Sequence, residues 1–250
     1  MLAAERKKFI LGVLKSEGRV LATELSARLG ISEDTIRRDL RDLADEGLLQ
    51  RVHGGALPRS PAAVSYADRQ HQLSHGKIAI ARRAAGLIRD GMVVFLGGGT
   101  TNTRLAASLS PDLRATILTH NPAAAIALAE HPNVDVILIG GHLLKTMLVT
   151  VGVDAVENIQ RMRADLCMLG VCSLHPEAGI SIPILEEAYV QRAMIASSAE
   201  VVALASAEKL GTAASFIVGP IRDVNIIVTE PSVPDEVLEP YRELGIEILR

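Results

Sequence analysis

Residues 76–250 alternate short apolar runs with stretches of helical pattern, and few folds satisfy such an alternation. Seven runs stand at residues 92–96, 115–119, 134–139, 166–169, 201–205, 225–229 and 246–249. Helical stretches such as "GKIAIARRAAGLIRDG" and "NPAAAIALAEH" lie between them. Near-continuously apolar strands separated by helices predict an α/β domain, built on a mainly parallel sheet with both faces covered. Hydrophobic residues make up 48% of the chain and aromatic residues 2%, so the predicted core is sizeable and aliphatic.

Polar and glycine-rich turns follow several of these runs. Ligands of open α/β sheets bind beyond the carboxyl ends of the strands, so these turns are the candidate binding site. The candidates are Gly98, Gly99, Thr100, Thr101, Asn102, His120, Asn121, Gly140, Gly141 and Lys209.

The turn "GGGTTN" after the first run, residues 97–102, matches neither common phosphate loop. A P-loop ends in Gly-Lys-Ser/Thr, and no lysine occurs here. The dinucleotide fingerprint requires a glycine at the position of Asn102. Bare backbone and hydroxyl groups at a strand-to-helix turn nevertheless favour an anion. The alternatives are that the glycines serve only tight backbone packing and that Lys209 is an ordinary surface lysine.

The first 57 residues predict a different module. Three helical segments, "AERKKFILGVLKSEG", "LATELSARLG" and "ISEDTIRRDLRDLADEG", precede a strand pattern with a Gly-Gly turn. Ile36, Leu40 and Leu43 form an apolar stripe on the third segment, for which Ser32 is the expected N-cap. This arrangement predicts a winged helix-turn-helix that binds DNA, rather than an inert solvated face. The expected DNA-binding residues are Ser32, Asp34, Thr35, Arg37, Arg38 and Arg41 on the third helix, with Arg51 and His53 in the wing.

Charge and composition support a division of the chain. Residues 1–60 carry 11 Lys and Arg against 9 Asp and Glu, whereas residues 61–250 carry 15 against 20. The Pro-, Ser- and Ala-rich stretch after residue 57 is typical of a linker. The expected boundaries are a DNA-binding domain at 1–57, a linker at 58–75 and an effector domain at 76–250.

The stretch "SEDTIRRDLRDLADEGLLQRVHGGA", residues 32–56, resembles the signature of the DeoR family of bacterial transcription regulators nearly residue for residue. The resemblance continues at lower density through most of residues 5–230. It implies a winged helix-turn-helix followed by an effector domain similar to ribose-5-phosphate isomerase. It also implies a repressor that senses a phosphorylated sugar or a related metabolite, and it places Glu187 near the effector pocket or at a helix cap.

Two positions depart from that family pattern. Family members usually carry Asp where this chain has Gly97, and Asp where it has Ser206. Family members usually carry Thr-Asn after the second strand, where this chain has Thr119-His120-Asn121. Either His120 or Asn121 therefore takes the place of that asparagine. We therefore expect a less negative pocket that is roomier at Gly97, and an effector that differs from a simple hexose or pentose monophosphate; water filling the gaps is the alternative.

Other function classes are disfavoured. Cys167 and Cys172 are expected to be small buried hydrophobes in a reducing cytoplasm, and the histidines show no metal-ligand spacing. No signal peptide or membrane-spanning run stands out. A sugar-phosphate isomerase is the alternative function, but the run Asp-Gly-Ala-Asp-Glu of true isomerases is missing, so no enzyme, catalytic residue, metal or cofactor is expected. Symmetric operator recognition predicts a homodimer or homotetramer.

Overall fold

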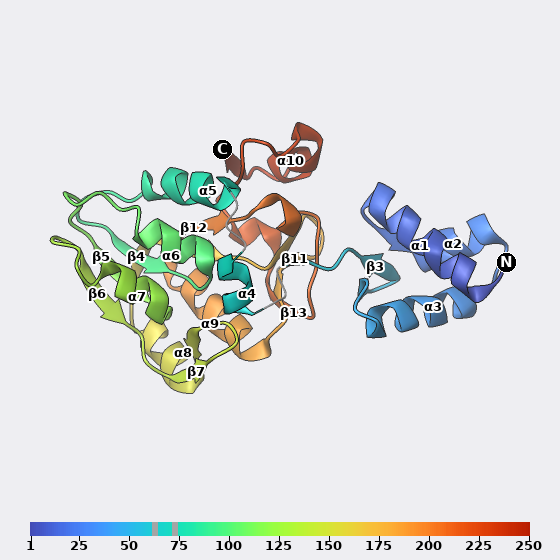
Figure 1. Ribbon diagram of the computed structural model, residues 1–250, viewed down its shortest axis with the longest axis horizontal. Coiled ribbons are helices and arrows are strands. Elements are labelled where there is room, and N and C mark those ends of the chain that lie inside the picture. The colour runs from blue at the N-terminus through green and yellow to red at the C-terminus, as the bar shows by residue number, and fades with distance from the viewer. Residues whose placement is uncertain (62–64, 72–74) are drawn as a thin grey trace.

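The computed structural model describes residues 1–61, 65–71 and 75–250, which form two lobes joined by a narrow connection (Figure 1). The smaller lobe holds the helices α1 (Ala3–Glu17), α2 (Ala22–Leu29) and α3 (Glu33–Asp45). Its small sheet has the order β1-β3-β2 and comprises β1 (Val20–Leu21), β2 (Gln50–Val52) and β3 (Gly55–Leu57). The three helices and the β2–β3 wing confirm the expected helix-turn-helix lobe; the short strand β1 was not expected.

Local sequence explains where these helices begin and end. Gly18 and Gly30 adopt φ values of 72° and 64° as they close α1 and α2, a backbone that glycine adopts at no steric cost. The Ser32 side chain caps α3 by accepting a hydrogen bond from the Thr35 amide at 3.4 Å, as expected. The apolar stripe of α3 is buried against α1 and α2, which leaves the opposite face exposed.

The larger lobe is organised by a seven-stranded sheet of order β15-β14-β12-β9-β4-β5-β6, in which every neighbouring pair is parallel. Its strands are β4 (Val93–Leu96), β5 (Thr116–Thr119), β6 (Asp135–Leu138), β9 (Ala164–Gly170), β12 (Ser198–Leu204), β14 (Ile226–Val228) and β15 (Glu247–Leu249). All seven expected apolar runs therefore lie in one parallel sheet.

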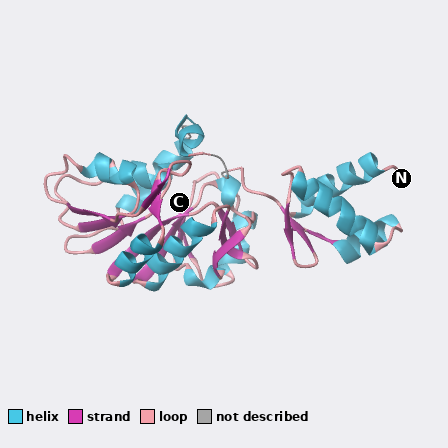
Figure 2. Ribbon diagram, turned by 90° about the horizontal axis from the view of Figure 1, so that it is seen from below, coloured by secondary structure: helices cyan, strands magenta, loops and turns pink. Residues whose placement is uncertain are grey.

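Helices cover both faces of this sheet (Figure 2). Along β4, Val94 and Leu96 face one core and Phe95 faces the other, as the alternation of a strand requires. The first core also contains residues of α5 (His75–Ala85), α6 (Thr100–Ala106) and α7 (Pro122–Leu128). The second contains residues of α8 (Val153–Gln160), α9 (Leu185–Ala196) and α10 (Asp235–Arg242).

Two smaller sheets were not expected from the sequence. One pairs β7 (His142–Leu144) with β8 (Val149–Val151), and the other joins β10 (Ser173–His175), β11 (Gly179–Ile182) and β13 (Phe216–Gly219). Short 3-10 helices lie at Ala207–Lys209 (η1) and Ile221–Asp223 (η2). These short strands follow the ends of longer elements, where periodicity over three or four residues is too brief to distinguish a strand from a loop.

The stretch expected to be a linker has structure of its own. It contains the helix α4 (Tyr66–His71), and Arg59 forms an isolated bridge with Ala213 of the larger lobe. Residues 62–64 and 72–74 of the same stretch lie outside the described residues.

Candidate functional site

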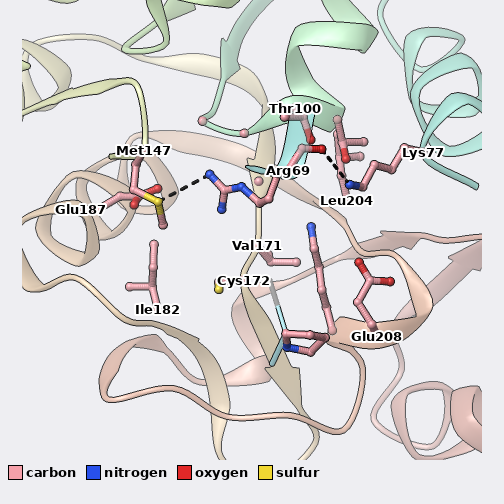
Figure 3. A pocket seen from close by; sticks show the side chains of 16 residues that line it. Arg69, Lys77, Thr100, Met147, Val171, Cys172, Ile182, Glu187, Leu204 and Glu208 are labelled. Atoms are coloured by element: carbon pink, nitrogen blue, oxygen red, sulfur yellow. Dashed lines mark hydrogen bonds between the residues drawn. The ribbon is translucent and has the colours of Figure 1, made fainter. Parts of the chain in front are cut away.

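A cavity of about 130 Å³ lies at the carboxyl ends of the central strands (Figure 3). The turn after β4 contributes Gly98 to Thr101, and the turn after β9 contributes Gly170 to Cys172. This is the edge of the sheet where the sequence predicts a ligand. The other lining residues are Pro61, Arg69, Lys77, Met147, Ile182, Glu187, Leu204, Glu208 and Lys209.

The two glycines of the glycine-threonine turn are needed for different reasons, Gly98 for lack of space and Gly99 for its backbone conformation. A Cβ added at Gly98 would lie 2.7 Å from Val149 Cγ1, and Gly99 has a φ of 96°. Asn102 holds the turn in place, because its amide nitrogen donates to the carbonyl oxygens of Gly98 and Met168, each at 3.1 Å. Gly98 is therefore required by its contact with Val149 and Gly99 by its positive φ, and the turn presents Thr100 and Thr101 to the cavity.

The expectation of a roomier pocket at Gly97 is wrong. Gly97 does not line the cavity, and a Cβ there would lie 3.0 Å from Met168 O and 3.1 Å from Gly170 N. Neighbouring backbone of β9 fills the position, so the missing aspartate leaves no gap. Ser206 is buried and donates its hydroxyl to Glu208 Oε1 at 2.6 Å, and that glutamate restores a carboxylate to the cavity wall.

Among the described residues, three cations and two carboxylates line the cavity, and burial shifts the pKa of Lys209, Glu187 and Lys77. Burial lowers the pKa of Lys209 to about 8 and raises that of Glu187 to about 7. Burial also lowers the pKa of Lys77, and the cations Arg69 and Arg104 act in the same direction. Each pKa shift arises because the ionised form is poorly solvated. In such surroundings an opposite charge on a ligand contributes more binding free energy than it does at the surface.

Five of the expected ligand residues do not line the cavity: Asn102, His120, Asn121, Gly140 and Gly141. The Asn121 side chain caps α7, where its oxygen accepts from the amides of Ala123 at 3.1 Å and Ala124 at 3.4 Å. His120 is fully buried, and desolvation lowers its pKa to about 4, which keeps the ring neutral. Gly140 and Gly141 are exposed beyond β6. A direct ligand contact by these five residues stays a prediction.

Sequence reasoning missed several lining residues because they come from elements outside the strand ends. Arg69 lies on α4, within the expected linker, and Lys77 lies on α5, which reads only as a helix. Cys172 also lines the cavity; burial raises its pKa, and both cysteines are free and buried as expected.

The second candidate site is the exposed face of α3. Arg38 and Arg41 are exposed there, and Arg37 forms an ion pair with Glu33 at 2.8 Å. The wing turn at Gly54 exposes Arg51 and His53. Asp34 is exposed and Thr35 half-buried at the start of the helix. This placement matches the orientation expected for a recognition helix and its wing, and the DNA contacts themselves stay predictions.

The side of the wing toward the larger lobe has a different environment. His53 also lines a cavity of about 220 Å³ with His175 and Glu177, which belong to the larger lobe. In the same crevice Arg19 pairs with Glu177 at 3.0 Å. His53 is thus close to both a prospective DNA surface and the neighbouring lobe.

Among the described residues, no helix is both long and apolar enough to cross a bilayer. Within that same part of the chain, no group of three or more His, Cys, Asp or Glu side chains is arranged to hold a metal ion.

Two solved structures are similar to part of the chain. Ribose 5-phosphate isomerase A from Methanocaldococcus jannaschii is 16% identical, covers 53% of this chain and 52% of its own, and gives a TM-score of 0.38. The β subunit of eIF2B from Chaetomium thermophilum is 15% identical over 70% of this chain and 60% of its own, with a TM-score of 0.45.

Sequence relatives are closer and extend over the full chain. The HTH-type transcriptional regulator GlpR of Haloferax volcanii is 34% identical over 100% of this chain and 98% of its own. The transcriptional repressor GlcR of Bacillus subtilis is 30% identical over 100% of this chain and 96% of its own. The glycerol-3-phosphate regulon repressor of Escherichia coli is 29% identical over 99% of each chain.

Two family descriptions match the two lobes in turn. The DeoR-like helix-turn-helix domain matches residues 6–61, and the DeoR C terminal sensor domain matches residues 72–231. The chain belongs to the DeoR family of transcriptional regulators, with a DNA-binding helix-turn-helix domain followed by an α/β sensor domain.

Proposed function

We propose that this regulator represses transcription and is released from its operator by a small phosphorylated carbohydrate bound in the cavity of the sensor domain. One observation carries the proposal: of the described residues that line this cavity, Arg69, Lys77 and Lys209 are cations, whereas two, Glu187 and Glu208, are carboxylates. An excess of cations in the lining favours an anionic ligand, and a cavity of about 130 Å³ favours a small one.

The uncharged parts of the cavity suit a carbohydrate phosphate. The hydroxyls of Thr100 and Thr101, with the backbone amides of their turn, are donors suited to phosphate oxygens. Glu187 accepts hydrogen bonds from sugar hydroxyls when ionised and donates one when protonated. The Escherichia coli relative is named for glycerol 3-phosphate, which is a compound of this class.

A thermal-shift panel tests the proposal. Glycerol 3-phosphate, ribose 5-phosphate and fructose 6-phosphate are compared with glycerol, ribose and fructose, using the full chain. A ligand at about a hundred times its dissociation constant stabilises the folded state by about 2.7 kcal/mol, so at least one phosphorylated compound raises the melting temperature. If no phosphorylated compound does so, the proposed effector class is wrong.

The variant Lys209→Ala tests the site. A charged hydrogen bond contributes about 1.5–3 kcal/mol, so affinity for the phosphorylated compound falls roughly tenfold to a hundredfold in calorimetry. Lys145→Ala is the matched control, because Lys145 is exposed and lies outside the cavity lining. Unchanged affinity in Lys209→Ala removes this lysine from the site.

The α3 face and the wing are proposed to bind operator DNA. The operator sequence is to be identified by selection from a random-sequence duplex library with the full chain. The phosphorylated compound that passes the thermal test is expected to weaken this binding, because a ligand relieves repression only through a lower affinity for the DNA-competent state. An isomerase would instead use a positioned carboxylate and an electrophile, a pairing that Glu187 and Lys209 resemble. We expect no conversion of ribose 5-phosphate, and measurable turnover would favour that second function.

A further inference from the structure

The chain that joins the two lobes forms part of the wall of the sensor cavity. Pro61 and Arg69, both from the expected linker, line it together with Lys209. The wing strand β3 ends at Leu57, only four residues before Pro61. The cavity is therefore in contact with the segment that leads directly into the DNA-binding domain.

Two hydrogen bonds connect this segment to Lys209, one between the segment and the loop that follows Lys209 and one within that loop. Ala213 donates its amide to Pro58 O at 3.0 Å, and Thr212 Oγ1 donates to Lys209 O at 2.8 Å. Lys209 is thus connected to the end of the wing through two pairs of chain neighbours: Thr212 and Ala213 in the loop, then Pro58 and Leu57. A displacement of this loop moves Pro58 with it as long as these hydrogen bonds hold.

The helix α4 is attached at the other side of the cavity through Tyr66. Its amide donates to Thr146 O at 2.7 Å, and its hydroxyl lies 3.1 Å from Thr103 Oγ1 on α6. Tyr66 is 6% exposed, so this attachment is a packed contact. It connects α4 to α6, the helix that begins in the glycine-threonine turn.

Arg69 extends from α4 across the cavity toward Met147 and Glu187 (Figure 3). Its Nη2 donates to Met147 Sδ at 3.5 Å, and Lys77 Nζ donates to Arg69 O at 3.5 Å. A thioether is a weak acceptor, whereas a guanidinium matches the paired oxygens of a phosphate or carboxylate. A ligand anion in the cavity is therefore a stronger acceptor for the Arg69 guanidinium than the Met147 thioether is.

We propose that Arg69 is an effector-binding residue, and that its contact with the ligand anion transmits occupancy of the cavity to the DNA-binding domain through the described parts of the connecting segment, residues 58–61 and 65–71. This inference rests on the proposed function, since it assigns a further residue and a route to the same anionic ligand. It makes the connecting segment a ligand-binding element as well as a spacer.

Calorimetry on Arg69→Ala tests the binding role, with whichever of glycerol 3-phosphate, ribose 5-phosphate and fructose 6-phosphate stabilises the unaltered protein most. We expect a tenfold to hundredfold loss of affinity. Arg69→Lys, which keeps the charge but not the paired donors, is expected to lose less. Arg82→Ala, an exposed arginine on α5, is the control with the same change in charge. Full affinity in both Arg69 variants overturns the inference.

Operator binding tests the route. At ligand concentrations that saturate each protein, the ligand is expected to release a smaller fraction of bound operator from Arg69→Ala than from the unaltered protein, each measured against its own operator binding without ligand. Equal release at saturation overturns the transmission. If Arg69→Ala proves unfolded, amide hydrogen exchange of the unaltered protein decides: the phosphorylated compound, but not its unphosphorylated counterpart, slows exchange in residues 65–71.

The failures are distinguishable. If no phosphorylated compound binds the unaltered protein, the proposed function and this inference fail together. If the compound binds, Lys209→Ala loses affinity and Arg69→Ala does not, only this inference fails.

Discussion

The charge of single buried side chains predicts how stability depends on pH. Burial raises the pKa of Glu187 from 4.5 to about 7, so between these pH values the folded protein holds a proton that the unfolded chain releases. This contribution to stability is fully present below pH 4.5 and is lost as the pH rises through 7. The shift corresponds to at most about 3 kcal/mol.

We therefore expect Glu187→Gln to raise the melting temperature at pH 8 and to leave it nearly unchanged at pH 4.5. The amide resembles the protonated acid and carries no buried charge to desolvate. Thermal unfolding over this pH range checks the expectation, with Glu186→Gln as control because Glu186 is the exposed neighbour on α9. Equal shifts in the two variants at pH 8 would contradict the assigned burial effect.

On the DNA-binding face, Arg38 is the side chain whose removal should affect operator binding most and stability least. Arg38→Ala is expected to abolish or severely weaken operator binding with little change in stability, because Arg38 is exposed opposite the buried stripe of α3. If Arg38 contacts a phosphate, the slope of log affinity against log salt also falls by about 1. Fluorescence anisotropy at matched salt measures both quantities, and Arg161→Ala, on the sensor domain, is the control. Parental affinity in Arg38→Ala would contradict the assignment.

Between elements, one ion pair joins α1 to the recognition helix. Arg6 on α1 contacts both carboxylate oxygens of Asp39 on α3, with Nη2 to Oδ1 at 2.9 Å. The two side chains are only 12% and 5% exposed. Removal of one partner leaves the other charge poorly solvated, so Asp39→Leu is expected to destabilise the helix-turn-helix lobe by about 2–3 kcal/mol.

The double variant Arg6→Met with Asp39→Leu is expected to recover much of that loss, because an apolar pair leaves no buried charge. Denaturant unfolding measures both variants. Glu33→Gln, which breaks the exposed pair with Arg37, is the control, and we expect a change below about 0.5 kcal/mol. A double variant no more stable than Asp39→Leu would show that the pair does more than neutralise charge.

For the full chain, the two domains are expected to be linked reciprocally. If the phosphorylated compound weakens operator binding by some factor, bound operator must weaken binding of that compound by the same factor. Calorimetry with and without saturating operator duplex gives this factor, and an unrelated duplex is the control. Unequal factors would mean that a third equilibrium, such as a change of oligomeric state, is coupled to both.

Oligomeric state is a separate expectation for the full chain. A homodimer or homotetramer is predicted, because one winged helix contacts only a short DNA segment and symmetry doubles those contacts. Light scattering coupled to gel filtration measures the molar mass, to be compared with 26.6 kDa for one chain. A monomer that binds an operator without internal symmetry would contradict this expectation.

Periodicity along the sequence was enough to predict the α/β architecture, the three helices of the smaller lobe and the wing. Each of these elements depends on which face of a short segment is apolar, and that property is set by residues close together in the sequence. The cap at Ser32 and the closures at Gly18 and Gly30 are local for the same reason. Brief strands such as β10 and β13 lack enough residues to show a period.

The composition of the sensor cavity could be predicted only in part. Gly98, Thr100 and Lys209 follow strands and reach the cavity, as the rule for parallel sheets requires. Asn121 follows a strand too, but its side chain is engaged by the first turn of α7. Arg69 and Lys77 reach the cavity from α4 and α5, because packing on α6 brings distant segments together. Strand and helix identity is encoded by neighbours in the sequence, whereas the partners of a buried charge are set by which segments the fold brings into contact.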